Sequence, residues 1–249
     1  MRQLPTIIVP ARLASTRLER KLLYPIEGKP LILWTAERIR SEAPEFPLFF
    51  AVDSEELYAC LSRAGFEAIR TRDSHSSGTD RIAEANAIIG ADQVINVQGD
   101  EPLILGEQIR QLAESFNAGH SMATLATWFR DTEEFYDPNC VKVVRSFDGR
   151  ALYFSRAPIP YAREMEGSIS SEWLQENHCY KHMGIYAYTA EFLKEILELR
   201  PSVLESIERL EQLRVLENGY SIQLALSDKP SIGIDTIEDV ERFKVYLTG

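Results

Sequence analysis

A cluster of cations directly follows a short apolar strand near the start of the chain. Residues 7–9 are Ile-Ile-Val, a β-branched run typical of a central parallel strand covered on both faces. The next twelve residues carry four cations: Arg12, Arg17, Arg20 and Lys21. Small and hydroxylated residues between them suit a phosphate better than a carboxylate, and ligands of open α/β sheets bind at such strand ends. The segment therefore predicts a phosphate-binding loop, with a solvated basic loop as the alternative.

Two aspartates also end apolar segments. Asp100 closes the segment VINVQGD, where Gly99 allows the backbone to approach a ligand closely. Asp235 follows the segment SIGI near the end of the chain. Because Mg²⁺ is commonly held by two carboxylates and substrate phosphate oxygens, the pair predicts a magnesium site. For Asp235 the alternative is a helix cap, since Asp235 and Glu238 have the spacing of a capping box.

Polar residues at two further places suit a nucleotide. The segment Ser76-Ser77-Gly78-Thr79 precedes a predicted helix, where hydroxyls and backbone N–H groups can meet an anion or a base edge. From these residues alone a simple N-cap is the favoured interpretation. Gln98 lies at the same strand end as Asp100 and offers both a donor and an acceptor to a base.

A strand and a helix in the second half carry candidates for binding hydroxyls. In KHMGIYAY, alternation places His182, Gly184, Tyr186 and Tyr188 on one face. The gap at Gly184 predicts either a sugar-binding site or an aromatic packing layer. One helix is expected over residues 203–218, with Glu211 on the same row as buried apolar positions and Gln212 beside it.

Two arginines flank the Pro-rich turn that follows ALYFS. Arg156 and Arg163 each carry a guanidinium that can hold a carboxylate through two hydrogen bonds. An acidic ligand near this turn is therefore expected.

Composition narrows the function classes. The 249 residues include 38 acidic and 27 basic side chains, and the net charge of -11 argues against a general nucleic-acid-binding surface. Three widely spaced cysteines suggest neither a disulfide framework nor a zinc site, so a reducing cytoplasm is the simplest setting. No apolar run is long enough to span a bilayer, and no signal peptide is expected. The common motifs of P-loop, dinucleotide-binding, serine hydrolase and zinc protease sites are missing from the sequence.

Strand and helix patterns alternate through the first hundred residues. Helices are expected near 30–41, 54–64 and 80–89, and strands at 48–52, 67–71 and 94–98, which predicts a parallel sheet covered by helices. Beyond residue 102 the expected strands are 122–127, 141–146, 151–155, 181–188 and 222–226, and the expected helices are 106–117, 190–197, 203–218 and one from 236. The long loop at 158–178 is interpreted as a lid or a partner-facing arm. No domain boundary is visible, so we expect one domain over 1–249 with an arm or insertion at about 120–190.

Several segments together resemble one enzyme family along nearly the whole chain. They are PARLASTRLERK, SGTDR, NVQGDEP, ALYFSRAPIP, KHMGIYAY, LEQLRVLENG and the ending DTIED. Their order is similar to that of the 3-deoxy-manno-octulosonate (Kdo) cytidylyltransferases, within the broader sugar nucleotidyltransferase group. The resemblance implies a Rossmann-like α/β fold with a mostly parallel sheet, helices on both faces and a dimerisation arm, typically in a homodimer. It also implies transfer of CMP from CTP to Kdo, with release of pyrophosphate, for lipopolysaccharide synthesis.

The resemblance also assigns roles to residues. It implies that Lys21, Asp100 and Asp235 are catalytic, with the two aspartates holding Mg²⁺. The CTP-binding residues it implies are Ala11, Arg12, Ser15, Arg17, Lys21, Arg72, Ser77, Gly78 and Gln98. Those implied for the Kdo pocket are Arg156, Arg163, His182, Tyr186, Glu211 and Gln212.

One departure from the family pattern concerns the phosphate-binding loop. Family members usually have Pro-Gly before the lysine and Pro after it, whereas this chain has Glu19-Arg20 before Lys21 and Leu22 after it. Loss of the glycine removes an easy positive-φ position, and Arg20 as a further phosphate contact is one alternative. For the function, the alternatives are another 2-keto-3-deoxy sugar acid, such as an amino-Kdo, as acceptor, and a catalytically silent nucleotide-binding protein.

Overall fold

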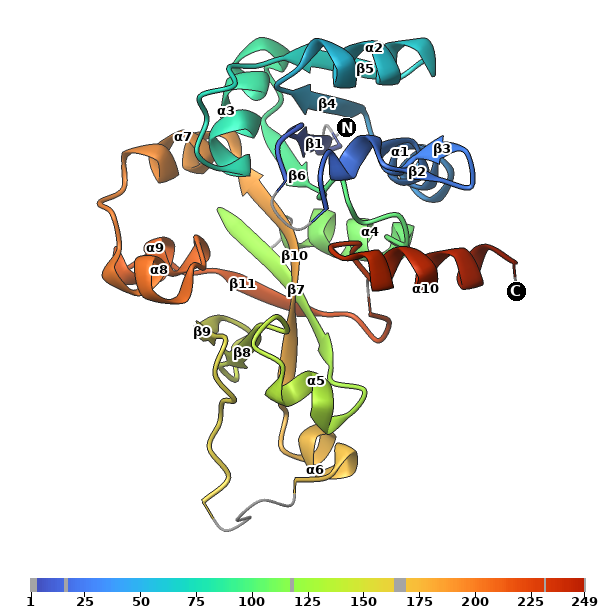
Figure 1. Ribbon diagram of the computed structural model, residues 1–249. Coiled ribbons are helices and arrows are strands. Elements are labelled where there is room, and N and C mark those ends of the chain that lie inside the picture. The colour runs from blue at the N-terminus through green and yellow to red at the C-terminus, as the bar shows by residue number, and fades with distance from the viewer. Residues whose placement is uncertain (1–3, 16–17, 117–118, 164–168, 231, 249) are drawn as a thin grey trace.

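The computed structural model describes residues 4–15, 18–116, 119–163, 169–230 and 232–248 (Figure 1). In the first half, four parallel strands alternate with helices. The strands are β1 (Thr6–Ala11), β4 (Leu48–Val52), β5 (Glu67–Arg70) and β6 (Gln93–Asn96). The helices between them are α1 (Leu31–Glu42), α2 (Glu55–Arg63) and α3 (Gly78–Ile89). Strand β1 pairs in parallel with β4 and β6, and β4 pairs with β5, which confirms the predicted parallel sheet.

The second half extends this sheet with strands of mixed direction. β10 (Tyr180–Thr189) runs antiparallel between β6 and β7 (Met122–Trp128), and β11 (Gln223–Leu226) pairs in parallel with β7. The strand order is therefore β11-β7-β10-β6-β1-β4-β5. A hairpin of β8 (Lys142–Arg145) and β9 (Ala151–Ser155) joins the sheet through β10.

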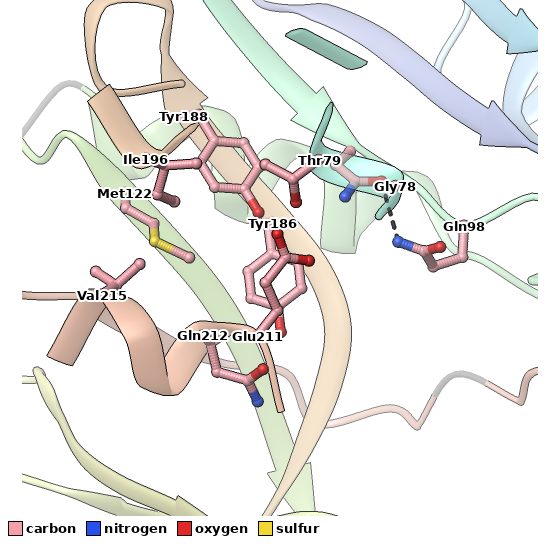
Figure 2. A pocket seen from close by; sticks show the side chains of 11 residues that line it. Gly78, Thr79, Gln98, Met122, Tyr186, Tyr188, Ile196, Glu211, Gln212 and Val215 are labelled. Atoms are coloured by element: carbon pink, nitrogen blue, oxygen red, sulfur yellow. Dashed lines mark hydrogen bonds between the residues drawn. The ribbon is translucent and has the colours of Figure 1, made fainter. Parts of the chain in front are cut away.

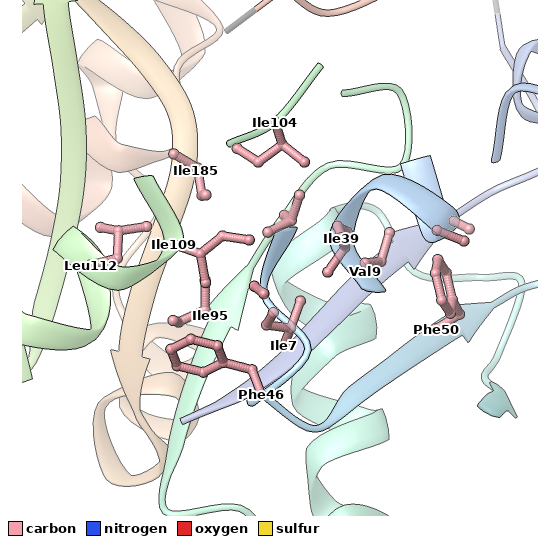
Figure 3. Close-up of a cluster of buried hydrophobic side chains, with 14 of the residues drawn as sticks. Ile7, Val9, Ile39, Phe46, Phe50, Ile95, Ile104, Ile109, Leu112 and Ile185 are labelled. Carbon is pink, nitrogen blue, oxygen red and sulfur yellow. The ribbon is translucent and has the colours of Figure 1, made fainter. Parts of the chain in front are cut away.

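Both faces of the sheet are covered by helices, as predicted. Ile7 and Val9 of β1 pack on one face with α1, α2 and α4 (Gly106–Ser115) (Figure 3). Ile8 faces the opposite side and packs with α3, α7 (Ala190–Glu198) and α9 (Gln212–Glu217). This division follows from the two-residue period of a strand, which sends neighbouring side chains to opposite faces. The core therefore holds the strand ends rigidly in place.

Several short elements lie outside the predicted pattern. They are the 3-10 helix η1 (Lys21–Leu23), the β2–β3 ribbon (Pro25–Ile26 and Lys29–Pro30), α5 (Thr132–Tyr136) and α6 (Ser171–Glu176). Helix α6 lies within the expected long loop, and its Leu174 packs against Phe129, Phe135 and Cys179. In Figure 1 this part of the chain extends past the end of the sheet.

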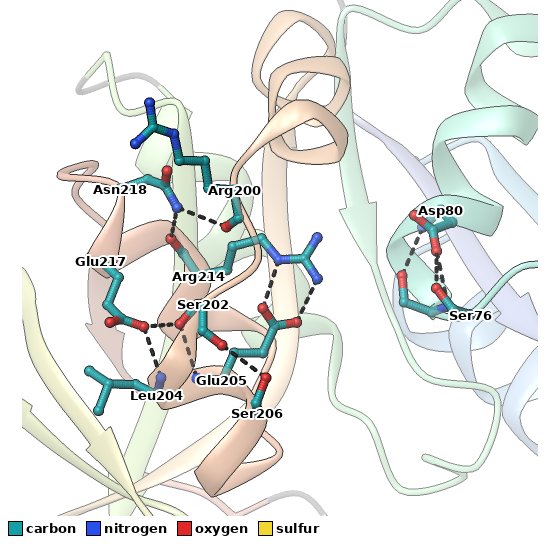
Figure 4. Close-up of polar contacts among 11 residues, drawn as sticks. Ser76, Asp80, Arg200, Ser202, Leu204, Glu205, Ser206, Arg214, Glu217 and Asn218 are labelled. Carbon is teal, nitrogen blue, oxygen red and sulfur yellow. Dashed lines mark hydrogen bonds and ion pairs between the residues drawn. The ribbon is translucent and has the colours of Figure 1, made fainter.

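The helix expected over residues 203–218 is instead two helices, so that prediction was wrong. α8 (Val203–Glu208) ends where Arg209 adopts a left-handed conformation with φ 55°, and α9 follows. The Arg214 guanidinium donates two hydrogen bonds of 2.7 Å to Glu205 and ties the helices together (Figure 4). Ile207, Glu211 and Val215 therefore do not lie on one face of a single helix, as was expected. Ile207 is 72% exposed, while Val215 is buried. Glu211 instead precedes the first residue of α9.

The last helix, α10 (Ile237–Thr248), begins close to the predicted residue. Its cap, however, is one residue later than expected. The Asp239 carboxylate accepts hydrogen bonds from the Thr236 N–H at 2.9 Å and the Asp235 N–H at 3.0 Å, and the Thr236 hydroxyl accepts from the Asp239 N–H at 3.3 Å. Thr236 and Asp239 thus form the reciprocal pair of a capping box. The alternative that placed the Asp235 carboxylate in the cap was wrong.

Candidate active site

A cavity of about 340 Å³ lies at the carboxyl ends of β1 and β6. It is called the phosphate cavity below, because the predicted phosphate-binding loop lines it. Among the residues that line it are six predicted site residues: Arg12, Ser15, Lys21, Gln98, Asp100 and Asp235. They come from the loop after β1, from η1, from the segment after β6 and from the segment before α10. Parallel packing of β1 and β6 explains the convergence, since it brings both strand ends to one edge of the sheet.

Lys21 links the two aspartates of this cavity. Its Nζ donates a hydrogen bond of 2.7 Å to Asp235 Oδ1 and also pairs with Asp100 Oδ2. Burial opposes the charged form of the lysine, but the two carboxylates outweigh that effect and raise its pKa above the usual value. The ammonium is therefore charged and lies between the two carboxylates.

These two carboxylates fit the chemistry of a magnesium site. Both reach the same ammonium nitrogen, so they are close enough to share one small cation. Among the described residues, no group of three or more His, Cys, Asp or Glu side chains is arranged to hold a metal ion. The remaining ligands would have to come from phosphate oxygens and water, which is common for Mg²⁺.

A second, smaller pocket of about 150 Å³ shares Gln98 with the phosphate cavity. Figure 2 shows its lining, which comes from α3, α7, the start of α9, strands β6, β7 and β10, and the segment after β6. The predicted residues present there are Gly78, Gln98, Tyr186, Glu211 and Gln212. Residues assigned to the nucleotide and residues assigned to the sugar therefore meet in one pocket.

Glu211 is a nearly buried carboxyl group in this pocket. Burial raises its pKa, while the nearby hydroxyls of Thr79 and Ser77 act in the opposite direction without cancelling the effect. Thr79 at the start of α3 and Glu211 just before α9 thus line the same pocket. A carboxyl group there is suited to accept hydrogen bonds from ligand hydroxyls.

Ser77 is the N-cap of α3. Its hydroxyl accepts a hydrogen bond of 3.1 Å from the Asp80 N–H, and the Ser77 N–H donates to the Asp80 carboxylate at 3.1 Å. The simple-cap interpretation of Ser77 was therefore correct, although the helix begins at Gly78 rather than near Asp80. Gln98 is held nearby, because its amide donates to Asn96 Oδ1 at 3.1 Å.

His182 lies in an aromatic layer. Its ring is 4.9 Å from that of Phe154 and 5.4 Å from that of Tyr186, measured between ring centroids, so His182 and Tyr186 approach each other across Gly184. The Nε2 atom is 2.9 Å from the Thr124 hydroxyl. Burial lowers the pKa of His182 to about 3, so the imidazole is neutral at physiological pH. His182 also lines a third cavity, of about 400 Å³, which borders Asp235.

Other predicted residues do not line these cavities. Ala11 is buried in β1, and the exposed Arg72 lies 3.5 Å from the Glu84 carboxylate. The Arg156 guanidinium donates to the backbone carbonyls of Glu208 at 2.7 Å and Pro138 at 2.9 Å. Arg163 is exposed and lines none of these three cavities. Arg17 lies outside the described residues.

The backbone accommodates Arg20 at the position where family members usually have glycine. Arg20 adopts the left-handed conformation with φ 52° that a glycine would take without strain. Its side chain pairs with Glu56 of α2 and does not line the phosphate cavity. The alternative of an added phosphate contact therefore has no support in this conformation.

The small pocket contains three polar residues to which the sequence assigned no role: Thr79, Asn96 and Tyr188. Thr79 directly follows Ser77 and Gly78 in the motif SGTDR. Asn96 was missed altogether. It is a buried amide at the end of β6, and such a position is a usable signal because buried polar groups need partners. Tyr188 follows Tyr186 on the same face of β10, where the two rings stack with centroids 6.0 Å apart.

A family model for cytidylyltransferases matches residues 6–223. The chain belongs to the cytidylyltransferase family. Among relatives of this family, 3-deoxy-manno-octulosonate cytidylyltransferase 2 of Actinobacillus pleuropneumoniae serotype 5b is 45% identical over 248 residues, with 98% of each chain covered. The 3-deoxy-manno-octulosonate cytidylyltransferase of Geotalea daltonii is 42% identical over 95% of each chain.

One solved structure agrees with this cytidylyltransferase assignment, and a second shares the fold. CMP:2-keto-3-deoxy-manno-octonic acid synthetase, solved in complex with CTP, superposes with a TM-score of 0.88 at 34% identity and 99% coverage of both chains. A putative glucose-1-phosphate thymidylyltransferase from Bacillus anthracis gives a TM-score of 0.65 at 17% identity, with 97% of this chain and 94% of that chain covered. The second likeness concerns the fold alone.

Proposed function

We propose that the protein transfers CMP from CTP to the anomeric hydroxyl of Kdo and releases pyrophosphate. The observation that carries this proposal is the meeting of two cavities at Gln98. One contains cations and paired aspartates, and the other contains a buried carboxyl group, an amide and tyrosine hydroxyls. A nucleoside triphosphate fits the first cavity, and a polyhydroxylated ligand fits the second. Relatives named for this reaction support the assignment.

In this reaction the sugar hydroxyl attacks the α-phosphorus of CTP, and the bond to the bridging oxygen of pyrophosphate breaks. Arg12 and Lys21 line the cavity in which the triphosphate would lie, so they would stabilise the charge that the leaving pyrophosphate gains. Gln98 would orient the nucleotide at the junction of the two cavities. Glu211 and Gln212 would hold the sugar hydroxyls on the opposite side.

Asp100 and Asp235 would hold Mg²⁺ in the loaded enzyme. The ion supplies positive charge at the phosphates and lowers the pKa of a bound hydroxyl. Lys21 must then leave its present position between the carboxylates and become available to the triphosphate.

We also propose a homodimer formed through the predicted arm, at about residues 120–190. Phe147, Leu152 and Tyr161 of that segment expose large apolar side chains, at 111%, 57% and 83%. Strand β9 pairs only with β8 among the described strands, and its other edge donates one hydrogen bond of 2.8 Å, from the Ala151 N–H to the Ile222 carbonyl. The rest of that edge, from Leu152 to Ser155, could therefore pair with a partner. Size-exclusion chromatography with light scattering tests this proposal, since Leu152→Glu should then yield monomers.

We infer a reducing compartment, the cytoplasm, for this enzyme. Cys60, Cys140 and Cys179 are free thiols. No helix in the described part of the chain has the length and apolar character needed to cross a bilayer.

A pyrophosphate-release assay with CTP, magnesium and a panel of sugar acids tests the proposed function. The panel should contain Kdo, an 8-amino analogue of Kdo and a sialic acid. We expect turnover with Kdo that exceeds turnover with the others. Preference for the amino analogue would transfer the assignment to that acceptor, and lack of turnover with every sugar acid would favour a silent nucleotide-binding protein.

A further inference from the structure

Arg81 of α3 is a buried arginine that lines neither of the two cavities proposed to bind CTP and Kdo. Its side chain is only 3% exposed. A charge so deeply buried is costly unless it is paired and hydrogen-bonded. The partners of Arg81 therefore indicate why the charge is kept there.

The Arg81 guanidinium joins three elements. Nη1 donates to the Thr71 hydroxyl at 2.6 Å and to the Arg72 carbonyl at 3.2 Å, directly after β5. Nη2 lies 3.8 Å from Asp53 Oδ2, directly after β4. One side chain of α3 thus fixes the ends of two neighbouring strands.

Asp53 in turn holds the phosphate-binding loop. The Leu13 N–H donates to both Asp53 carboxylate oxygens, at 2.9 Å and 3.2 Å, and the Asp53 N–H donates to the Ala11 carbonyl at 3.3 Å. The Asp53 side chain is only 11% exposed. Arg12, which lines the phosphate cavity, lies between Ala11 and Leu13 in the sequence. The contacts with Asp53 therefore hold the backbone on both sides of Arg12.

Charge explains why the two residues occur together. A lone carboxylate so close to a phosphate-binding loop would repel the triphosphate. The nearby guanidinium offsets that charge, so the carboxylate can hold the Leu13 N–H without weakening the positive potential of the loop. Binding groups held in place before the ligand arrives lose less entropy on binding.

We propose that Asp53 and Arg81 are positioning residues that fix the phosphate-binding loop relative to the N-terminus of α3. The proposal rests on the proposed function, because it assigns the loop to the triphosphate of CTP and α3 to the cytidine side. The pair would thereby set the distance between the phosphate and base subsites. Neither residue needs to touch the substrate.

Four variants separate this role from a general contribution to folding. Asp53→Ala removes the acceptor and the charge, whereas Asp53→Asn keeps the volume and one acceptor oxygen for Leu13. Arg81→Lys keeps the charge but loses the planar fork that reaches three partners. Arg70→Ala is the matched control, because it breaks an exposed ion pair with Glu55 at the end of the same strand β5.

Dissociation constants of CTP, tripolyphosphate and cytidine, measured by calorimetric titration and competition, test the proposal together with melting temperatures. For Asp53→Ala we expect the dissociation constants of CTP and tripolyphosphate to rise at least about tenfold. The dissociation constant of cytidine should stay within about twofold of the parent value. Asp53→Asn and Arg81→Lys should show the same pattern with smaller losses, and Arg70→Ala should match the parent.

Two outcomes would overturn the proposal. One is parent-like binding of all three ligands by Asp53→Asn and Arg81→Lys. The other is an equal loss for cytidine and CTP, which would indicate a general folding role. Failure of the proposed function is distinguishable, because it would appear as a parent protein that binds CTP but does not turn over any sugar acid.

Discussion

Lys21 and Asp235 lie at opposite ends of the chain, yet Lys21 Nζ donates a 2.7 Å hydrogen bond to Asp235 Oδ1. The same ammonium pairs with Asp100. A cation thus lies between the carboxylates that we propose as magnesium ligands. It offsets their mutual repulsion in the protein without substrate, and it is already inside the cavity that we assign to the triphosphate. Binding of metal and nucleotide should therefore displace Lys21 from the aspartates toward the phosphates.

Lys21→Ala should consequently have two opposite effects. Without nucleotide, the two carboxylates lose a competing cation, so the affinity for Mn²⁺, measured by electron paramagnetic resonance, should rise. With nucleotide, the Michaelis constant for CTP should rise and kcat should fall, because pyrophosphate gains charge as it leaves.

Lys29→Ala is the control for that experiment, because Lys29 pairs with Glu37 outside the cavity. An unchanged or weaker Mn²⁺ affinity in Lys21→Ala would contradict competition between the Lys21 ammonium and the metal ion for the two carboxylates. A higher Michaelis constant with unchanged kcat would remove Lys21 from leaving-group stabilisation.

Asp100→Asn should abolish turnover and leave the fold intact. The change keeps the side-chain volume but removes one of two charged ligands, and lost charge stabilisation of this kind typically costs about 10²-fold or more in rate. The measurement is kcat across a magnesium titration, together with the melting temperature. Asp92→Asn, on the exposed turn before β6, should behave as the parent. Parent-like turnover of Asp100→Asn would exclude the carboxylate from the site.

Glu211→Gln should impair use of the sugar acid far more than binding of CTP. The carboxyl group lies in the small pocket rather than the phosphate cavity, and replacing one carboxyl oxygen by an NH₂ group removes an acceptor for a ligand hydroxyl, which costs about tenfold. We expect kcat/KM for Kdo to fall by that amount while the dissociation constant of CTP stays within about twofold. Glu191→Gln, on the exposed surface of α7, is the control. Equal losses for both ligands would argue against a sugar-specific role.

Stability should fall with decreasing pH through His182. Burial lowers its pKa to about 3 in the folded protein, against an ordinary value of 6.5 for an exposed histidine, so the unfolded chain binds the proton first. The stabilisation is complete above pH 6.5 and is lost progressively toward pH 3, by about 1.4 kcal/mol at pH 5.5.

Urea unfolding at pH 7.5 and 5.5 checks the size of this loss. In His182→Gln the decrease in the free energy of unfolding between pH 7.5 and pH 5.5 should be smaller than in the parent by about that amount. His178→Asn should keep the full decrease, because His178 is exposed and asparagine tolerates its positive φ of 55°. An identical decrease in the parent and His182→Gln would contradict a neutral buried imidazole.

Local signals in the sequence account for the parts of the fold that were predicted well. Strand β4 has the predicted bounds, Leu48–Val52, because an apolar run ends at the capping residue Ser54. The break between α8 and α9 was missed, because it depends on a left-handed Arg209, a conformation that its residue type does not favour. The shift of the α10 cap from Asp235 to Thr236 was missed because both residues are good N-caps.

The candidate site was predictable where one segment carries its signal. Arg12 and Lys21 in the basic loop and the strand-end Asp100 are examples, and all three line the phosphate cavity. Contacts between distant segments gave no such signal. Asp53 and Arg81 have no motif in common, and their link to Leu13 depends on the adjacency of β1 and β4 in the sheet. The meeting of Glu211 and Thr79 in the small pocket likewise depends on how the start of α9 lies near the start of α3.

The most direct test of the central claim is the fate of label from CTP in a reaction with Kdo and magnesium. With [α-³²P]CTP, we predict that the label appears in a CMP–sugar product in equal amount to the pyrophosphate released. With [γ-³²P]CTP, the label should appear in pyrophosphate alone, and Asp100→Asn should form neither product. Label from the γ-position in the sugar product, or pyrophosphate release that does not depend on Kdo, would contradict transfer of CMP to the sugar.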